Sequence, residues 1–101
     1  MSSWKNLIGQ GVVVFSASYC PHCTKAKNTL KSLGVAAKVI ECDLEWSPAQ
    51  ISELKSESGH TTFPNIFVGD KHVKGNSDLQ NAISDKSIFP LFDKYGVAYS
   101  Q

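Results

Sequence analysis

The stretch VVVFSASYCPHC at residues 12–23 decides how the rest of this 101-residue chain is interpreted. Its first four residues are apolar and mostly β-branched, which is typical of a strand that is buried on both faces of a sheet. Its last four residues, Cys20 to Cys23, place a proline where a helix would begin. A buried strand that leads into Cys-Pro-x-Cys at a helix start is a specific context for a redox-active pair of thiols.

The two cysteines have different surroundings in this arrangement. Cys20 lies near the N-cap of the predicted helix, where unpaired N–H groups and the helix dipole favour a thiolate, so we predict that it is the catalytic nucleophile. Cys23 lies one turn further along and is more enclosed, which suits a resolving thiol that attacks a mixed disulfide at Cys20. His22 either adds positive charge near Cys20 or is an exposed spacer, and the sequence leaves both interpretations open.

Two other interpretations of the motif are weaker. A structural zinc site needs four ligands, and the remaining candidates Cys42, His60 and His72 fit no recognised spacing, so no metal site is predicted. An inert buried pair of cysteines is disfavoured by the strand-to-helix context.

Composition indicates one globular domain over residues 1–101, because 42% of the residues are hydrophobic and 19% charged. Ten lysines and no arginine disfavour nucleic-acid binding, since arginine is the residue best suited to phosphate and guanine contacts. No apolar run approaches the roughly 20 residues that span a bilayer, and the start, Met1 to Lys5, lacks the layout of a secretory signal. We expect a cytoplasmic protein with no membrane partner, which the odd count of three cysteines also favours.

The rest of the chain predicts alternating helices and strands. A helix is expected from about Pro21 to Leu33, and a strand over 38–44 with Ile40, Cys42 and Leu44 toward the core. The other expected elements are a helix that begins at Ser47-Pro48 and ends at Gly59, a hairpin of 64–68 and 71–74, a helix over 76–83 that Asn76 or Ser77 caps, and a last helix over 89–95. This order gives an α/β architecture, in which a small mixed sheet has helices on both faces.

Three sequence blocks together resemble the dithiol glutaredoxins over nearly the whole chain. They are 13–16 leading into 20–23, then Thr62–Val68, then Gly75–Leu79. The resemblance implies a thioredoxin fold with a four-stranded mixed β-sheet and a cis peptide bond before Pro64. It also implies glutathione as the cosubstrate, with no tightly bound cofactor, and we expect a monomer.

The resemblance further implies a substrate site around the cysteines. The backbone N–H and C=O of Phe63 would pair with the cysteinyl backbone of glutathione. Helix-start N–H groups at Asn76 and Ser77 would bind the γ-glutamyl carboxylate, and the Asp78 carboxylate would bind the ammonium group. The predicted substrate-binding residues are Tyr19, His22, Thr62, Phe63, Pro64, Asn76, Ser77 and Asp78, with Cys20 and Cys23 as the catalytic residues.

Several positions around this site depart from the family pattern. Ala17 stands where a lysine that holds the glycine carboxylate is usual, and Thr61 stands where a basic residue is frequent. Lys74 replaces the first glycine of a Gly-Gly pair, and it either restores the missing positive charge, crowds the site or points into solvent. The Pro-His dipeptide between the cysteines, in place of Pro-Tyr, resembles oxidising thioredoxin-fold proteins of the bacterial periplasm.

The function that these features favour is a glutathione-linked thiol-disulfide oxidoreductase that acts on disulfide-containing or glutathionylated proteins. One alternative is a dithiol reductase served by a thioredoxin-type reductase. Another is an iron–sulfur cluster-binding module that uses Cys20 of two subunits and two glutathione thiols. Outside the site, Cys42 is interpreted as a small buried core residue, and His60 and His72 as solvated side chains.

Overall fold

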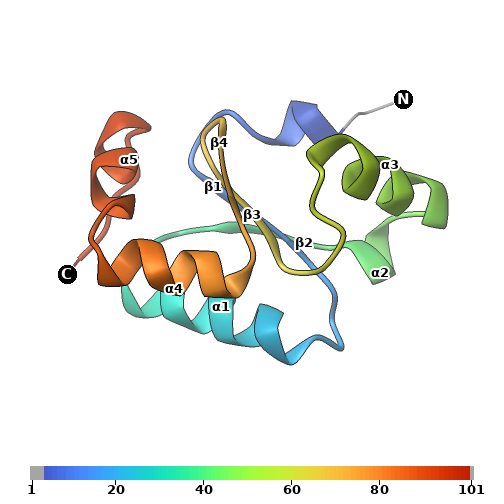
Figure 1. Cartoon of the computed structure of the whole chain (residues 1–101), viewed down its shortest axis with the longest axis horizontal. Coiled ribbons are helices and arrows are strands. Elements are labelled where there is room, and N and C mark those ends of the chain that lie inside the picture. The colour runs from blue at the N-terminus through green and yellow to red at the C-terminus, as the bar shows by residue number, and fades with distance from the viewer. Residues whose placement is uncertain (1–3, 101) are drawn as a thin grey trace.

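The computed structural model describes residues 4–100; residues 1–3, which belong to the start that lacks the layout of a secretory signal, and residue 101 lie outside that range. The described elements, in chain order, are a 3₁₀ helix Trp4–Leu7, β1 Val12–Ser16, α1 Pro21–Ser32, β2 Lys38–Glu41, α2 Cys42–Glu45, α3 Pro48–Ser58, β3 Asn65–Val68, β4 Lys71–Lys74, α4 Asn76–Ser84 and α5 Ile88–Lys94 (Figure 1). Within residues 4–100 no helix is both long and apolar enough to cross a membrane.

The four strands form one mixed sheet in the order β2-β1-β3-β4. β1 pairs in parallel with β2 and antiparallel with β3, and β3 pairs antiparallel with β4. The helices α1, α4 and α5 pack on one face of the sheet, whereas the 3₁₀ helix, α2 and α3 pack on the other. The predicted α/β fold, a four-stranded mixed sheet with helices on both faces, is confirmed.

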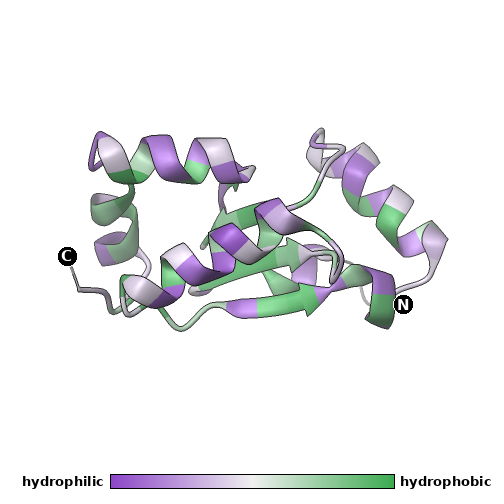
Figure 2. Cartoon of the chain, turned by 90° about the horizontal axis from the view of Figure 1, so that it is seen from below, coloured by the Kyte–Doolittle hydropathy of each residue, from purple (hydrophilic) through white to green (hydrophobic). Residues whose placement is uncertain are grey.

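β1 is the buried central strand that residues 12–15 predict. Val12 and Val14 pack in the core cluster of α1, α4 and α5, while Val13 and Phe15 pack in the cluster of α2 and α3. Every residue of β1 is buried, and Figure 2 shows mostly hydrophobic strands, whereas the helices around them carry many hydrophilic residues. Packing on both faces fixes the end of β1, from which residues 17–20 lead into α1.

The second strand is shorter than the alternation of residues 38–44 predicts. β2 ends at Glu41, and the next four residues form the short helix α2. The Glu45 carboxylate accepts a hydrogen bond from the Glu41 N–H at 2.9 Å, which satisfies a backbone donor at the start of this helix. Cys42 is buried as predicted, but Leu44 is 72% exposed. The prediction of a strand through Leu44 is therefore wrong.

The helix starts confirm one predicted cap and correct another. α3 begins directly after Ser47, as predicted. α4 begins after Gly75, whereas the sequence predicted Asn76 or Ser77 as the cap. The Asp78 carboxylate accepts a hydrogen bond from the Gly75 N–H at 3.1 Å, so an acidic side chain one turn into the helix satisfies the donor at the cap.

Candidate active site

Cys20 and Cys23 lie at the start of α1 and differ in exposure. Cys20 is the N-cap residue, with extended backbone (φ −95°, ψ 115°), and its Sγ accepts a hydrogen bond from the Cys23 N–H at 3.2 Å. Cys20 is partly exposed, whereas Cys23 is fully buried, and both are free thiols. The accessible sulfur thus lies where helix N–H groups stabilise negative charge, while the second sulfur is shielded from solvent.

Burial favours the protonated form of the Cys23 and Cys42 thiols. Burial, and next the hydrogen bond with Cys20, raises the pKa of the Cys23 thiol to about 11. Burial likewise raises the pKa of Cys42 to about 12. Cys42 packs in the core and its S–H donates to the Ile40 carbonyl at 3.7 Å, which confirms its interpretation as a core residue.

The loop before β3 lies against Cys20. The Cys20 S–H donates to the Phe63 carbonyl at 3.7 Å, and the peptide bond between Phe63 and Pro64 is cis, as the resemblance implied. Pro64 is buried, Phe63 is half-buried and Thr62 is exposed. The backbone of Phe63 therefore lies where an extended peptide that binds along this loop would meet the Cys20 sulfur.

A groove of about 220 Å³, here called the α4 groove, lies between this loop and the start of α4. Its lining residues are His22, His60, Thr62, Phe63, Pro64, Gly75, Asn76, Ser77 and Asp78. Seven of the eight predicted substrate-binding residues are brought together here, all except Tyr19. His60 and Gly75 line the groove in addition to the predicted residues.

The α4 groove has the charges that a zwitterion requires. Unpaired backbone N–H groups and the positive end of the helix dipole at the start of α4 favour a carboxylate. Ser77 and Asp78 are exposed at the same place. The Asp78 charge would attract an ammonium group, so this groove can bind both the carboxylate and the ammonium group of an amino acid.

His60 and His72 are half-buried, and the prediction that they are solvated is wrong. The His60 Nε2–H donates to the Pro64 carbonyl at 3.1 Å, and the His72 Nε2–H donates to the Asn65 amide oxygen at 2.6 Å. Burial, followed by the charges of His60 and Lys74, lowers the pKa of His72. In the part of the chain that the structure describes, no group of three or more His, Cys, Asp or Glu side chains could hold a metal ion.

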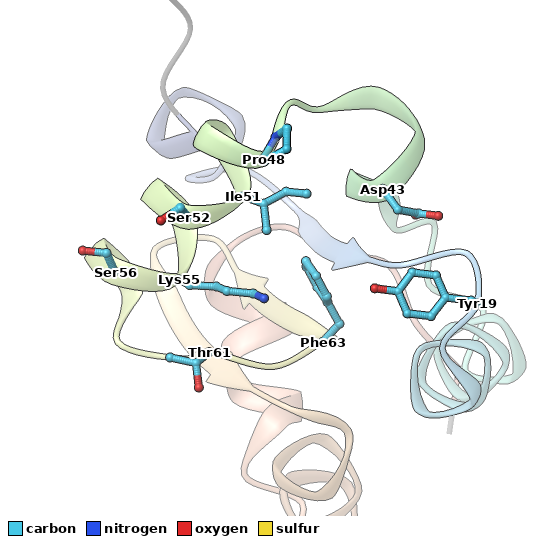
Figure 3. Close-up of a pocket in the computed structure, with 9 residues that line it drawn as sticks. All are labelled: Tyr19, Asp43, Pro48, Ile51, Ser52, Lys55, Ser56, Thr61 and Phe63. Carbon is cyan, nitrogen blue, oxygen red and sulfur yellow. The ribbon is translucent and has the colours of Figure 1, made fainter.

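A second and larger groove of about 590 Å³, here called the α3 groove, lies on the other side of Phe63. Its lining residues are Tyr19, Asp43, Pro48, Ile51, Ser52, Lys55, Ser56, Thr61 and Phe63 (Figure 3). Tyr19 is 76% exposed and faces Phe63 from one side, while Lys55 extends from α3 toward the same ring. Sequence reasoning missed Lys55, because only the packing of α3 beside the loop brings it to this position.

Three of the positions that depart from the family pattern, Ala17, Thr61 and Lys74, lie in three different places. Ala17 is buried, and its carbonyl accepts a hydrogen bond from the Cys20 N–H at 3.1 Å. Thr61 is exposed in the α3 groove. Lys74 is exposed, lines neither groove and has a φ of 83°, a left-handed conformation that glycine adopts more easily. Of the three interpretations of Lys74, the structure therefore supports the one in which it points into solvent.

Comparisons with known proteins agree with the site geometry. The family model described as Glutaredoxin matches residues 12–73, which include both cysteines and the loop before β3. A glutaredoxin from Ricinus communis is 38% identical over 98 residues, which cover 95% of this chain and 96% of that protein. Glutaredoxin-C2 from Arabidopsis thaliana is 39% identical over 88 residues, which cover 86% and 79%. The crystal structure of a buckwheat glutaredoxin-glutathione complex has a TM-score of 0.85 at 30% identity, covering 92% of this chain and 86% of that one.

Proposed function

This chain belongs to the glutaredoxin family, and we propose that it is a glutathione-linked thiol-disulfide oxidoreductase in which Cys20 attacks and Cys23 resolves. The observation that carries this proposal is the difference between the two thiols. One is partly exposed at the start of α1 beside the Phe63 carbonyl, and the other is buried one turn away. Its proposed substrates are protein disulfides and mixed disulfides between proteins and glutathione.

The first step is an attack by the Cys20 thiolate on the glutathione sulfur of a glutathionylated protein. A new S–S bond forms between Cys20 and glutathione as the original S–S bond breaks, and the protein sulfur leaves as a thiolate that takes up a proton. A second glutathione thiolate then attacks this mixed disulfide and releases oxidised glutathione together with the Cys20 thiolate. One mixed disulfide and one glutathione thiol thus give one protein thiol and one oxidised glutathione.

Cys23 provides a second route from the same mixed disulfide. Its sulfur attacks the Cys20 sulfur, glutathione leaves as a thiol, and the resulting Cys20–Cys23 disulfide is reduced by two further glutathione thiols. The thiolate is the attacking species, and burial raises the pKa of Cys23 to about 11. Closure by Cys23 should therefore accelerate as the pH rises.

We assign the α4 groove to glutathione. Its γ-glutamyl carboxylate would accept hydrogen bonds at the start of α4, its ammonium would lie beside Asp78, and its cysteinyl backbone would pair with Phe63. The similarity to a glutaredoxin that was crystallised as a glutathione complex supports this assignment. All of these residues come from one chain, and we propose that the protein acts as a monomer.

Glutathione-dependent reduction of a small glutathione mixed disulfide tests the proposal with wild type, Cys20→Ser and Cys23→Ser. We expect turnover by wild type and Cys23→Ser and none by Cys20→Ser. Asp78→Asn should raise KM for the mixed disulfide with little change in kcat. Turnover by Cys20→Ser would overturn the assignment of the nucleophile. A wild-type protein that is reduced only by a thioredoxin-type reductase would overturn glutathione as the reductant.

A further inference from the structure

His60 lines the α4 groove, although its place in a loop predicts a solvated side chain. Its Nε2–H donates to the Pro64 carbonyl at 3.1 Å, and the same nitrogen lies 3.2 Å from the Thr62 hydroxyl oxygen. Because a carbonyl oxygen can only accept, this nitrogen carries a proton, and the two oxygens share one donor. Thr62 and Pro64 flank Phe63, to which the proposed function assigns the cysteinyl backbone of glutathione. One imidazole N–H therefore holds the loop on both sides of Phe63.

The His60 ring also lies against the start of α4. A methyl group added at Gly75 would lie 3.5 Å from the His60 Cε1 atom, an ordinary van der Waals distance, and 3.7 Å from an Asp78 carboxylate oxygen. The same Asp78 oxygen accepts a hydrogen bond from the Gly75 N–H at 3.1 Å. The ring is therefore a neighbour both of the loop that carries Phe63 and of the helix start that is assigned the γ-glutamyl group.

Neighbouring elements hold His60 in this position. Its backbone N–H donates to the Ser58 hydroxyl oxygen at 3.3 Å, and that oxygen also accepts from the Asn65 side-chain amide at 3.0 Å. Ser58 is the last residue of α3, and Asn65 is a buried residue at the start of β3. The His72 ring lies nearly perpendicular to the His60 ring, with centroids 6.0 Å apart. The fold thus fixes the imidazole through several contacts, which a residue that positions others requires.

We propose that His60 is a positioning residue that sets the spacing between the two halves of the glutathione site. The proposal rests on the proposed function, in which Phe63 binds the cysteinyl residue and the start of α4 binds the γ-glutamyl residue. Two contacts with one ligand reinforce each other only when their spacing matches the ligand, because a mismatch distorts the ligand or the loop. Loss of the His60 contacts should therefore reduce what the γ-glutamyl residue contributes and leave the Cys20 sulfur equally reactive.

The test measures this contribution in the reaction of Cys20 with two substrates. They are the mixed disulfides of 2-mercaptoethanol with glutathione and with cysteinylglycine, which lacks only the γ-glutamyl residue. The protein carries Cys23→Ser, so that the adduct persists. The Cys20 thiolate attacks the peptide sulfur, a new S–S bond forms as the old one breaks, and 2-mercaptoethanol leaves as a thiolate that takes up a proton. Acid quenching and mass spectrometry give the second-order rate constant of this adduct.

The preference for glutathione is the ratio of the two rate constants, each divided by that of the same disulfide with free N-acetylcysteine. The variants are His60→Leu, which removes the donor, and His60→Gln, which restores an N–H donor. His72→Gln is the matched control, because His72 is also half-buried and lies beside His60 but lines neither groove. His60→Leu should lower the preference about fivefold, the equivalent of one ordinary hydrogen bond. His60→Gln should recover most of it, and His72→Gln should keep it.

An unchanged preference in His60→Leu would overturn the proposal. An equal loss with both substrates would also overturn it, because His60 would then support Phe63 alone. A loss in His72→Gln as large as that in His60→Leu would make general packing the cause. Slower alkylation of Cys20 by iodoacetamide in His60→Leu would place the effect on the sulfur instead. A wild-type chain that shows no preference for the glutathione disulfide would refute the assignment of the α4 groove in the proposed function.

Discussion

Raising the pH should accelerate closure of the Cys20–glutathione mixed disulfide by Cys23. Cys23 must lose its proton to attack, and in the free dithiol its pKa is about 11, first because of burial and then because of the hydrogen bond with Cys20. At pH 7 about one Cys23 thiol in ten thousand is therefore ionised. In the mixed disulfide Cys20 is uncharged, which lowers the pKa of Cys23, but burial continues to hold it above its ordinary range.

The rate of closure should consequently rise about tenfold per pH unit, or about a hundredfold between pH 6 and pH 8. The mixed disulfide can be formed at acidic pH, separated from free glutathione, and moved to the chosen pH by rapid mixing. Release of glutathione is then followed by acid quenching and mass spectrometry. Cys23→Ser is the control and should retain its glutathione. A rate that does not depend on pH, or equal release from Cys23→Ser, would refute the reasoning.

Three further predictions concern stability. Lys74→Gly should raise the free energy of unfolding by about 0.5–1 kcal/mol. The left-handed φ of 83° costs a non-glycine residue about 1–2 kcal/mol, and the greater conformational freedom of glycine in the unfolded chain offsets part of that gain. Lys74→Ala keeps that φ, so an equal gain in urea denaturation would mean that charge, not backbone conformation, is the cause. Ser47→Ala should lower stability by about 1 kcal/mol, since its hydroxyl accepts the Gln50 N–H at 3.3 Å, and an unchanged urea midpoint would contradict this. Burial lowers the pKa of His72 in the folded chain, so the unfolded chain binds more protons as the pH falls. The contribution of neutral His72 to stability is therefore fully present above about pH 6.5 and is lost as the pH falls below it. His72→Gln should flatten this loss between pH 7.5 and pH 5 in urea titrations, and an unaltered pH dependence would exclude His72 as its source.

Elements with one dominant physical requirement could be predicted from the sequence. Residues 12–15 are apolar without alternation and therefore need a layer on each face, which β1 has. Pro21 directly after a cysteine fits the start of a helix better than any position within one. Most of the α4 groove follows as well, because its residues belong to local motifs whose meeting point is set by the topology of the sheet.

Features that depend on distant partners could not be predicted. Leu44 alternates like a strand residue, but Asp43 beside it is held by Ser18, which lies 25 residues earlier in the chain. The position of His72 on an edge strand predicts a side chain in solvent. It is half-buried because Asn65, a buried polar side chain on the neighbouring strand, requires a hydrogen-bond partner. In each case the local sequence is compatible with two structures, and a contact with a distant segment determines which one forms.

The absence of a cation at position 17 changes what stabilises the Cys20 thiolate. A lysine at position 17 would lie on the segment that leads into Cys20, so its charge would act on both the sulfur and the substrate. Ala17 is buried and uncharged, and the lysine that lines the α3 groove, Lys55, comes from α3 and has its Nζ 5.3 Å from the centre of the Phe63 ring. In this arrangement the stabilisation of the Cys20 thiolate depends on the start of α1. Lys55→Glu should then leave the rate at which Cys20 reacts with a neutral alkylating agent unchanged, and a slower reaction would show that Lys55 also stabilises the thiolate.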